Sequence, residues 1–178
     1  MAKETSDPSD PSRAFADLSE WRKIAVAGDG VLGWLGRLLD ADLSQVAPGR
    51  ACHAYARPVE GEQSVHVTVT APGGSLMVVQ DPDSTPSVVP LLSAHAAGSD
   101  ISLEDRTADL ALFAFPARTI PPDVAGGAYS APSCLGEGVD VFALAEDRRR
   151  ILGSFSKRFR LLESEELRRW NRGRVVSD

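Results

Sequence analysis

The sequence is poor in cysteine and has no long uninterrupted apolar run. Its two cysteines, Cys52 and Cys134, do not form a CxxC pair, which excludes a disulfide framework and predicts that both are small buried side chains. No apolar run approaches the length of a membrane span, and no signal peptide opens the sequence. We therefore expect a soluble, cytoplasmic protein without stable membrane insertion.

Histidine is also scarce, and catalytic motifs are missing. The three histidines, His53, His66 and His95, are scattered without the spacing of metal ligands, so we expect no metal site and place them at the surface or at satisfied core positions. Gly30 stands where a lipase-like GDS motif needs its nucleophile, and no GxSGG motif follows His95 and Asp109. The sequence thus predicts no catalytic residue.

The length and composition suit a single domain. The chain has 178 residues, of which 43% are hydrophobic, enough for one sizeable core. Residues 1–12 are acidic and rich in proline and serine, which predicts a disordered tail. We expect one α/β domain over residues 13–172 and a short tail over residues 173–178.

Charge is distributed unevenly along the chain. The formal net charge of −6 argues against general nucleic-acid binding, and the aromatic residues are too sparse for a nucleic-acid platform. Residues 148–174 reverse the balance, with ten Lys and Arg against three Glu. We predict that residues 146–172 are helical, with Ile151, Phe155, Phe159 and Leu162 forming one apolar stripe. We also predict that Arg149, Arg150 and Arg158 bind a protein partner, whose matching surface would be acidic.

Apolar periodicity predicts strands that alternate with helices. Residues 31–46 carry Leu32, Leu35, Leu39 and Leu43 at helical spacing, and residues 13–22 read as a short helix or a lead-in to the first strand. The predicted strands are residues 23–27, the two arms of an antiparallel hairpin over residues 64–80, and the apolar runs 109–115 and 139–145. This order predicts an α/β sheet with helices on both faces.

The stretch KIAVAGDGVLGWLGRLL has the strand, glycine turn and helix of a phosphate-binding loop. Gly28 and Gly33 have the GxxxxG spacing of such a loop, in which backbone N–H groups hold phosphates. A working loop continues with a lysine, which neutralises phosphate, and a serine or threonine, which holds magnesium. Trp34 and Leu35 stand at these two positions, and Asp29 adds a carboxylate that phosphates would repel.

The order of elements around this loop resembles that of Ras-like and dynamin-like P-loop small GTPases, from about residue 21 to 165. Asp81 ends the second hairpin strand, where the family has DxxG, and Ser84 replaces its glycine. ADLALFAFPA is similar to the family strand ADLVLFVVDA. The guanine-reading NKxD motif aligns with Ala145, Glu146, Asp147 and Arg148.

This resemblance implies a mostly parallel Ras-like P-loop sheet with one antiparallel hairpin and helices on both faces. Because the lysine, the magnesium ligand and the guanine reader are absent, it implies a pseudo-GTPase without catalysis, cofactor, metal or nucleotide binding. Such a domain would serve as a protein-interaction or regulatory subunit of a larger assembly.

The same glycines leave a second hypothesis open. Gly28, Gly30 and Gly33 form the GxGxxG fingerprint of NAD(P)- or FAD-binding Rossmann-type oxidoreductase domains. That fold needs an acidic residue about twenty positions further on, at the end of a parallel second strand. His53, which is not acidic, stands near this position, and a predicted hairpin follows it in place of a parallel strand. The oxidoreductase domain therefore remains only the alternative to the GTPase resemblance.

Overall fold

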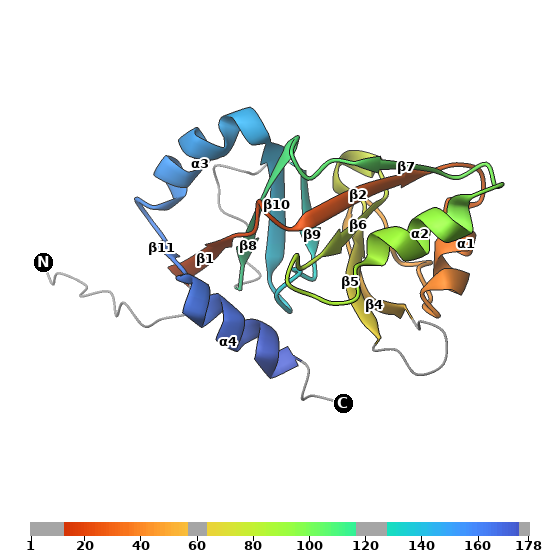
Figure 1. The fold of residues 1–178 in the computed structure, drawn as a ribbon. Coiled ribbons are helices and arrows are strands. Elements are labelled where there is room, and N and C mark those ends of the chain that lie inside the picture. The colour runs from red at the N-terminus through yellow and green to blue at the C-terminus, as the bar shows by residue number, and fades with distance from the viewer. Residues whose placement is uncertain (1–12, 57–63, 117–127, 175–178) are drawn as a thin grey trace, which may run out of the picture.

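The structure is a computed structural model that describes residues 13–56, 64–116 and 128–174. Residues 1–12, predicted as a disordered tail, and residues 175–178 lie outside these ranges. The described residues form two β-sheets and four α-helices, and Figure 1 shows the sheets side by side with helices at both ends. Among them, no helix is long and apolar enough to cross a membrane.

The first sheet has five strands, all antiparallel, in the order β4-β5-β6-β2-β7. The predicted hairpin is confirmed within it, because β5 and β6 pair in antiparallel register through Val69 and Val78. The strand bounds are β2 (Arg22–Ala27), β4 (Cys52–Ala56), β5 (Val65–Thr70), β6 (Met77–Gln80) and β7 (Ser102–Asp105).

The second sheet has six strands and is mixed, in the order β11-β1-β8-β10-β9-β3. Two pairs are parallel, β1 with β11 and β3 with β9, and the other pairs are antiparallel. The strand bounds are β1 (Ala14–Asp17), β3 (Gly49–Arg50), β8 (Leu110–Phe115), β9 (Ala128–Ala131), β10 (Val139–Leu144) and β11 (Arg160–Leu161).

The helices cover the outer faces of this pair of sheets. Helices α1 (Val31–Leu38) and α2 (Val88–Ala96) lie against the five-stranded sheet, whereas α3 (Arg148–Phe155) and α4 (Ser164–Arg174) lie beside the six-stranded sheet (Figure 1). The Ser87 hydroxyl caps α2 by accepting a hydrogen bond from Val89 N. Two short 3₁₀ turns, η2 (Pro72–Gly74) and η4 (Ala145–Asp147), complete the elements used below.

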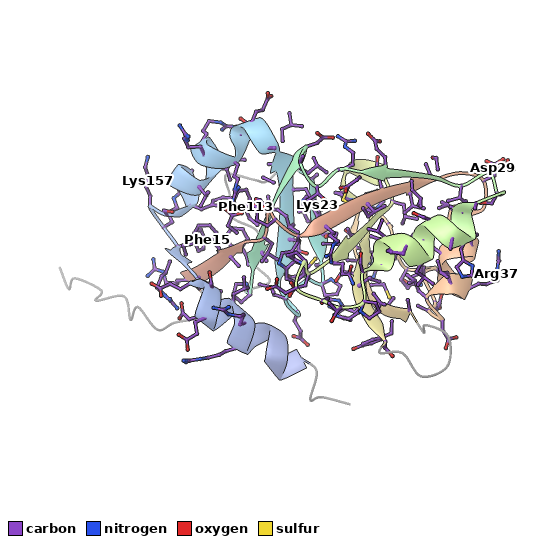
Figure 2. All side chains as sticks on the ribbon, viewed as in Figure 1. Phe15, Lys23, Asp29, Arg37, Phe113 and Lys157 are labelled. Atoms are coloured by element: carbon purple, nitrogen blue, oxygen red, sulfur yellow. The ribbon has the colours of Figure 1, made fainter. Side chains whose placement is uncertain are left out.

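Three apolar cores hold these layers together. An aliphatic core joins α1 and α2 to the five-stranded sheet, a second core lies between the two sheets, and a third joins the six-stranded sheet to α3. The third is aromatic, and the rings of Phe113 and Phe155 meet edge to face with centroids 5.5 Å apart. Its fully buried rings include Phe15 and Phe113, which Figure 2 shows close together.

The predicted Ras-like parallel sheet is therefore wrong, although most predicted strands exist. Residues 22–27 and 77–80 pair antiparallel in one sheet, while residues 110–115 and 139–144 pair antiparallel in the other. A single run of apolar residues fits either orientation, because both faces of each central strand are covered in either case. Residues 14–17, which were predicted as part of a short helix or a lead-in, form strand β1.

The basic C-terminal segment is also interrupted, contrary to the predicted continuous helix. Helix α3 ends at Phe155, and the chain returns to the sheet as β11 before α4 begins. Ile151, Phe155 and Phe159 pack into the third core as the apolar stripe predicted. Leu162 instead joins the second core, because β11 carries the chain back to β1, where Leu162 N donates to Phe15 O over 2.8 Å.

Candidate functional site

The glycine loop joins β2 to α1 at one extremity of the molecule, where Figure 2 shows Asp29. Gly28 (φ 141°) and Gly30 (φ 67°) take left-handed backbone conformations that favour glycine, and a side chain at Gly28 would meet the Asp100 carbonyl. Leu35 is fully buried and Trp34 half-buried against the aliphatic core. The loop is thus a strand-to-helix turn whose following residues serve packing.

The structure does not bring the other predicted nucleotide-site residues to this loop. Gln80 pairs with Arg22 at the start of β2, whereas Gly28 follows its end, so Asp81 and Ser84 lie at the opposite end of the sheet from the glycines. In a parallel sheet both would lie at the carboxyl edge. The antiparallel pairing of β2 with β6 separates them.

The residues aligned with the guanine reader belong to the other sheet. Ala145 and Glu146 form η4 directly after β10, and Arg148 begins α3. Of the residues singled out in the sequence, Ala145 and Arg148 line a groove built by several elements. Gly33 lies exposed on α1, and Arg149, Arg150 and Arg158 lie exposed on or after α3.

The groove lies where the chain crosses twice between the two sheets, a region that we call the junction (residues 18–23 and 105–109). The first crossing leads from β1 to β2 and the second from β7 back to β8. Backbone hydrogen bonds bind the crossings to each other, since Arg106 N donates to Lys23 O over 2.8 Å and Lys23 N donates to the Thr107 hydroxyl over 3.1 Å. The junction is therefore held by residues more than eighty positions apart in sequence, such as Lys23 and Thr107, which are 84 positions apart.

The junction groove has a volume of about 560 Å³ and is open to solvent. Its floor is apolar, and its walls carry both signs of charge. The residues that line it are Ser19, Glu20, Asp105, Thr107, Ala108, Leu110, Ala111, Ala145 and Arg148.

One wall of the groove is a network around Arg148. Its Nη2 lies 2.9 Å from Asp17 Oδ2 and its Nη1 lies 3.3 Å from Glu20 Oε1. Asp17 Oδ1 accepts hydrogen bonds from the Ser19 amide and hydroxyl, and the same hydroxyl accepts one from Leu112 N. The side chain of Asp17 is only 12% exposed, so the carboxylate and guanidinium fix each other at the start of α3.

The opposite wall carries an exposed acidic turn. Asp105 Oδ1 accepts a hydrogen bond from Thr107 N over 2.8 Å. Hydrogen bonds from Thr107, and to a smaller extent the charges of Lys23 and Arg22, lower the pKa of the Asp105 carboxyl. Asp105 therefore stays ionised at neutral pH, and with Glu20 it places two carboxylates at the groove.

A buried lysine lies beneath the junction. Lys23 is 0% exposed, and its Nζ donates to the carbonyl oxygens of Ser19 over 2.8 Å and Trp21 over 2.7 Å. Burial lowers its pKa to about 8, against smaller opposing effects of acidic groups such as Glu20 and Asp105. Figure 2 shows Lys23 in the middle of the molecule. Its ammonium group is buried inside the first crossing, where it binds two backbone carbonyl oxygens, and is not accessible to a ligand.

A buried carboxylate organises the loop next to the second core. Asp140 is 0% exposed and accepts hydrogen bonds from the Ser133 hydroxyl over 2.5 Å and from Cys134 N over 2.6 Å. Cys134 is buried as predicted, whereas Cys52 is only half-buried. Burial first, and then the charge of Asp42, raise the pKa of the Cys52 thiol, so neither cysteine has the environment of an activated nucleophile.

Sequence reasoning missed the junction almost entirely. Lys23 opens the predicted strand 23–27 and was not singled out as a site residue, because lysine is almost never fully buried. Ser19, Glu20, Asp105 and Thr107 stand in short polar segments without a motif.

Comparison with known proteins identifies the fold. No family model matches the chain, and no curated protein sequence matches it. The solved structure of glycine cleavage system aminomethyltransferase T from Bartonella henselae matches with a TM-score of 0.62 and 13% identity, over 88% of this chain and 50% of that chain. A chain of heterotetrameric sarcosine oxidase from Corynebacterium sp. U-96 matches with a TM-score of 0.48 and 12% identity, over 82% of this chain and 86% of that chain.

At 13% identity the first likeness concerns the fold alone. The chain spans about half the length of aminomethyltransferase T. This finding and the mixed and antiparallel sheets overturn the resemblance to Ras-like GTPases, and with it the pseudo-GTPase function. They overturn the Rossmann-type oxidoreductase alternative as well, because that fold requires a parallel sheet around the GxGxxG turn. Over 88% of its length, this chain thus has the fold of about half of aminomethyltransferase T.

Proposed function

We propose that this chain is an aminomethyltransferase-T-like domain that works within an enzyme assembly acting on amine-linked one-carbon substrates. The observation that carries the proposal is the likeness of 88% of the chain to half of aminomethyltransferase T. By its name that protein transfers an aminomethyl group within the glycine cleavage system. Fold alone does not fix chemistry, so the proposal rests equally on what the junction can bind.

The charges of the junction groove support an amine as its ligand. Asp105 and Glu20 are exposed carboxylates on the groove. Arg148 pairs with both Asp17 and Glu20, so its single positive charge is shared between two carboxylates and the groove keeps an excess of negative charge. The ammonium of Lys23 is buried and already donates to two carbonyl oxygens. A small protonated amine would therefore find acceptors there, and the apolar floor formed by Leu110 and Ala111 would hold its carbon atoms.

The exposed arginines of α3 support a protein partner as part of this proposal. The chain matches half of aminomethyltransferase T, so an activity of that whole protein would need a surface beyond the matched region. Arg149 and Arg150 are exposed on α3 next to Arg148 of the groove. We propose that they and Arg158 face acidic side chains of that partner, and that the assembly is cytoplasmic.

Ligand-dependent thermal unfolding tests the groove. The purified chain is heated with glycine and, separately, with methylamine, a protonated amine without a carboxylate. Because a ligand that binds only the folded state stabilises it, saturation is expected to raise the Tm by about 5 °C. The Glu20→Gln and Asp105→Asn double variant keeps the acceptor oxygens but loses both charges, and should abolish the shift produced by the amine.

Asp29→Asn provides the matched control, because it removes an exposed carboxylate at the far extremity of the molecule. It should keep the full shift. An equal shift in wild type and double variant would place the ligand elsewhere, and no shift with any probe would reject the groove. Native mass spectrometry of the tagged chain from its own cells tests the assembly separately; a monomer without a stoichiometric partner would reject that part.

A further inference from the structure

Two histidines that are distant in sequence meet on the five-stranded sheet. The register of β4 with β5 places Tyr55 opposite His66 and His53 opposite Thr68. Because side chains alternate along a strand, these four share one face of the sheet, while Ala54 and the valines of β5 point to the aliphatic core. Both imidazoles are half-exposed, so solutes can reach them.

The spacing of the two imidazole rings suits a shared metal ion. The ring centroids of His53 and His66 are 5.7 Å apart, with an angle of 37° between the ring planes. An ion about 2.0–2.1 Å from one nitrogen of each ring places the ring centres roughly 4.5–6.3 Å apart for bond angles from a right angle to linear. The observed distance therefore falls within the range that an ion can bridge with small side-chain rotations.

Neighbouring side chains already orient both rings. Nδ1 of His53 lies 3.1 Å from the hydroxyl oxygen of Thr68, a residue that is only 2% exposed. This contact leaves Nε2 as the nitrogen of His53 that would face an ion, as in metal sites where a second partner fixes the ring. The ring of Tyr55 lies 4.9 Å from that of His66 and restricts its rotation.

We propose that His53 and His66 form a two-histidine site for a divalent transition-metal ion of the imidazole-binding class. Cu²⁺ is expected to bind most tightly and Zn²⁺ and Ni²⁺ more weakly, following the general order of affinities. The described residues contain no group of three or more His, Cys, Asp or Glu side chains placed to hold a metal. The site therefore leaves coordination positions for water or for a donor from a partner. This inference is independent of the proposed function.

Copper titration of the intact chain tests the proposal. Wild type should bind one equivalent of Cu²⁺, with splitting from two imidazole nitrogens in the electron paramagnetic resonance spectrum. His53→Gln and His66→Gln should each weaken binding at least tenfold. Thr68→Val keeps the shape of a buried strand residue but loses the hydroxyl that orients His53, and should weaken binding about tenfold.

His95→Gln is the matched control, because His95 lies apart on α2, and it should keep the wild-type affinity. Circular dichroism confirms that each variant is folded. Equal affinity in His53→Gln, His66→Gln and wild type would overturn the proposal, as would a spectrum with a single imidazole nitrogen. Loss of binding in His95→Gln would overturn it too, because the ion would then lie on α2.

Discussion

The glycine loop has a recognisable sequence motif and the junction has none, yet it is the junction that joins charged residues of both sheets. The loop has a recognisable spacing of glycines, yet it turns the chain at one extremity and sends Leu35 into a core. The junction has no motif, yet it brings together Asp17, Glu20, Lys23 and Arg148 from both sheets and a helix. A local sequence pattern therefore predicts local backbone geometry, whereas a site made by residues far apart in sequence has no motif that predicts it.

Replacing one tryptophan in each region should give the largest contrast. Trp21 lies within the first crossing and is 8% exposed in the core between the sheets, whereas Trp34 after the glycine loop is partly exposed. Trp21→Ala should cost about 3–5 kcal/mol of unfolding free energy, and Trp34→Ala about 1–2 kcal/mol. Urea unfolding measures both. A larger loss for Trp34→Ala would reverse our ranking of the two regions.

Lys23 should make the folded chain more stable as the pH rises above 8. Its folded pKa of about 8 lies below the ordinary 10.5, so between these values the unfolded state binds more protons and stability rises with pH. The difference of 2.5 units corresponds to about 3 kcal/mol, gained from pH 8 to 10.5 and absent below pH 8.

Lys23→Met is the comparison that isolates this effect, since all other titrating groups are common to both proteins. Unfolding free energies of both proteins are measured at pH 7, 8, 9 and 10. The difference between them should stay constant from pH 7 to 8 and then shift in favour of wild type from pH 8 to 10. Parallel pH profiles for the two proteins would mean that the ammonium group is not penalised by its burial.

Arg148 should show the smallest effect at the junction. Its pair with Asp17 is partly buried, whereas the pair of Arg150 with Asp147 on the same helix is exposed. Arg148→Gln should cost about 1 kcal/mol at low salt, falling as salt screens the charges, and Arg150→Gln should change stability by less than about 0.5 kcal/mol. Guanidinium unfolding is unsuitable because it is itself a salt, so urea is used at two sodium chloride concentrations. Equal losses would show that burial of Asp17 adds nothing.

The sequence identified strands more reliably than their partners. Apolar runs such as LALFAF located β8, and alternation located β5, because burial of one or both faces shapes the residues of each strand. Pairing was not predictable, since the same runs fit parallel and antiparallel sheets. Strand β7, with the sequence SLED, lies at an exposed edge and carries no apolar signal.

The candidate sites could not be predicted from the sequence for a related reason, because their residues meet only through strand pairing and chain crossings. His53 and His66 are thirteen positions apart and meet only through the register of β4 with β5. Lys23 and Thr107 meet through the two crossings. Arg148 was singled out for a place in a guanine-binding motif, and it lies in the junction groove for a different reason, its ion pair with Asp17.

The order of strands along the chain also sets an order of assembly during synthesis. All strands of the five-stranded sheet lie between Arg22 and Asp105, so this sheet can form while the rest of the chain is still being made. Strand β1 leaves the ribosome first but pairs with β8 and with β11 at residues 160–161. Full pairing of β1 must therefore wait until residues 160–161 are made, and Phe15, which is buried in the folded chain, stays exposed to chaperones and to aggregation until then.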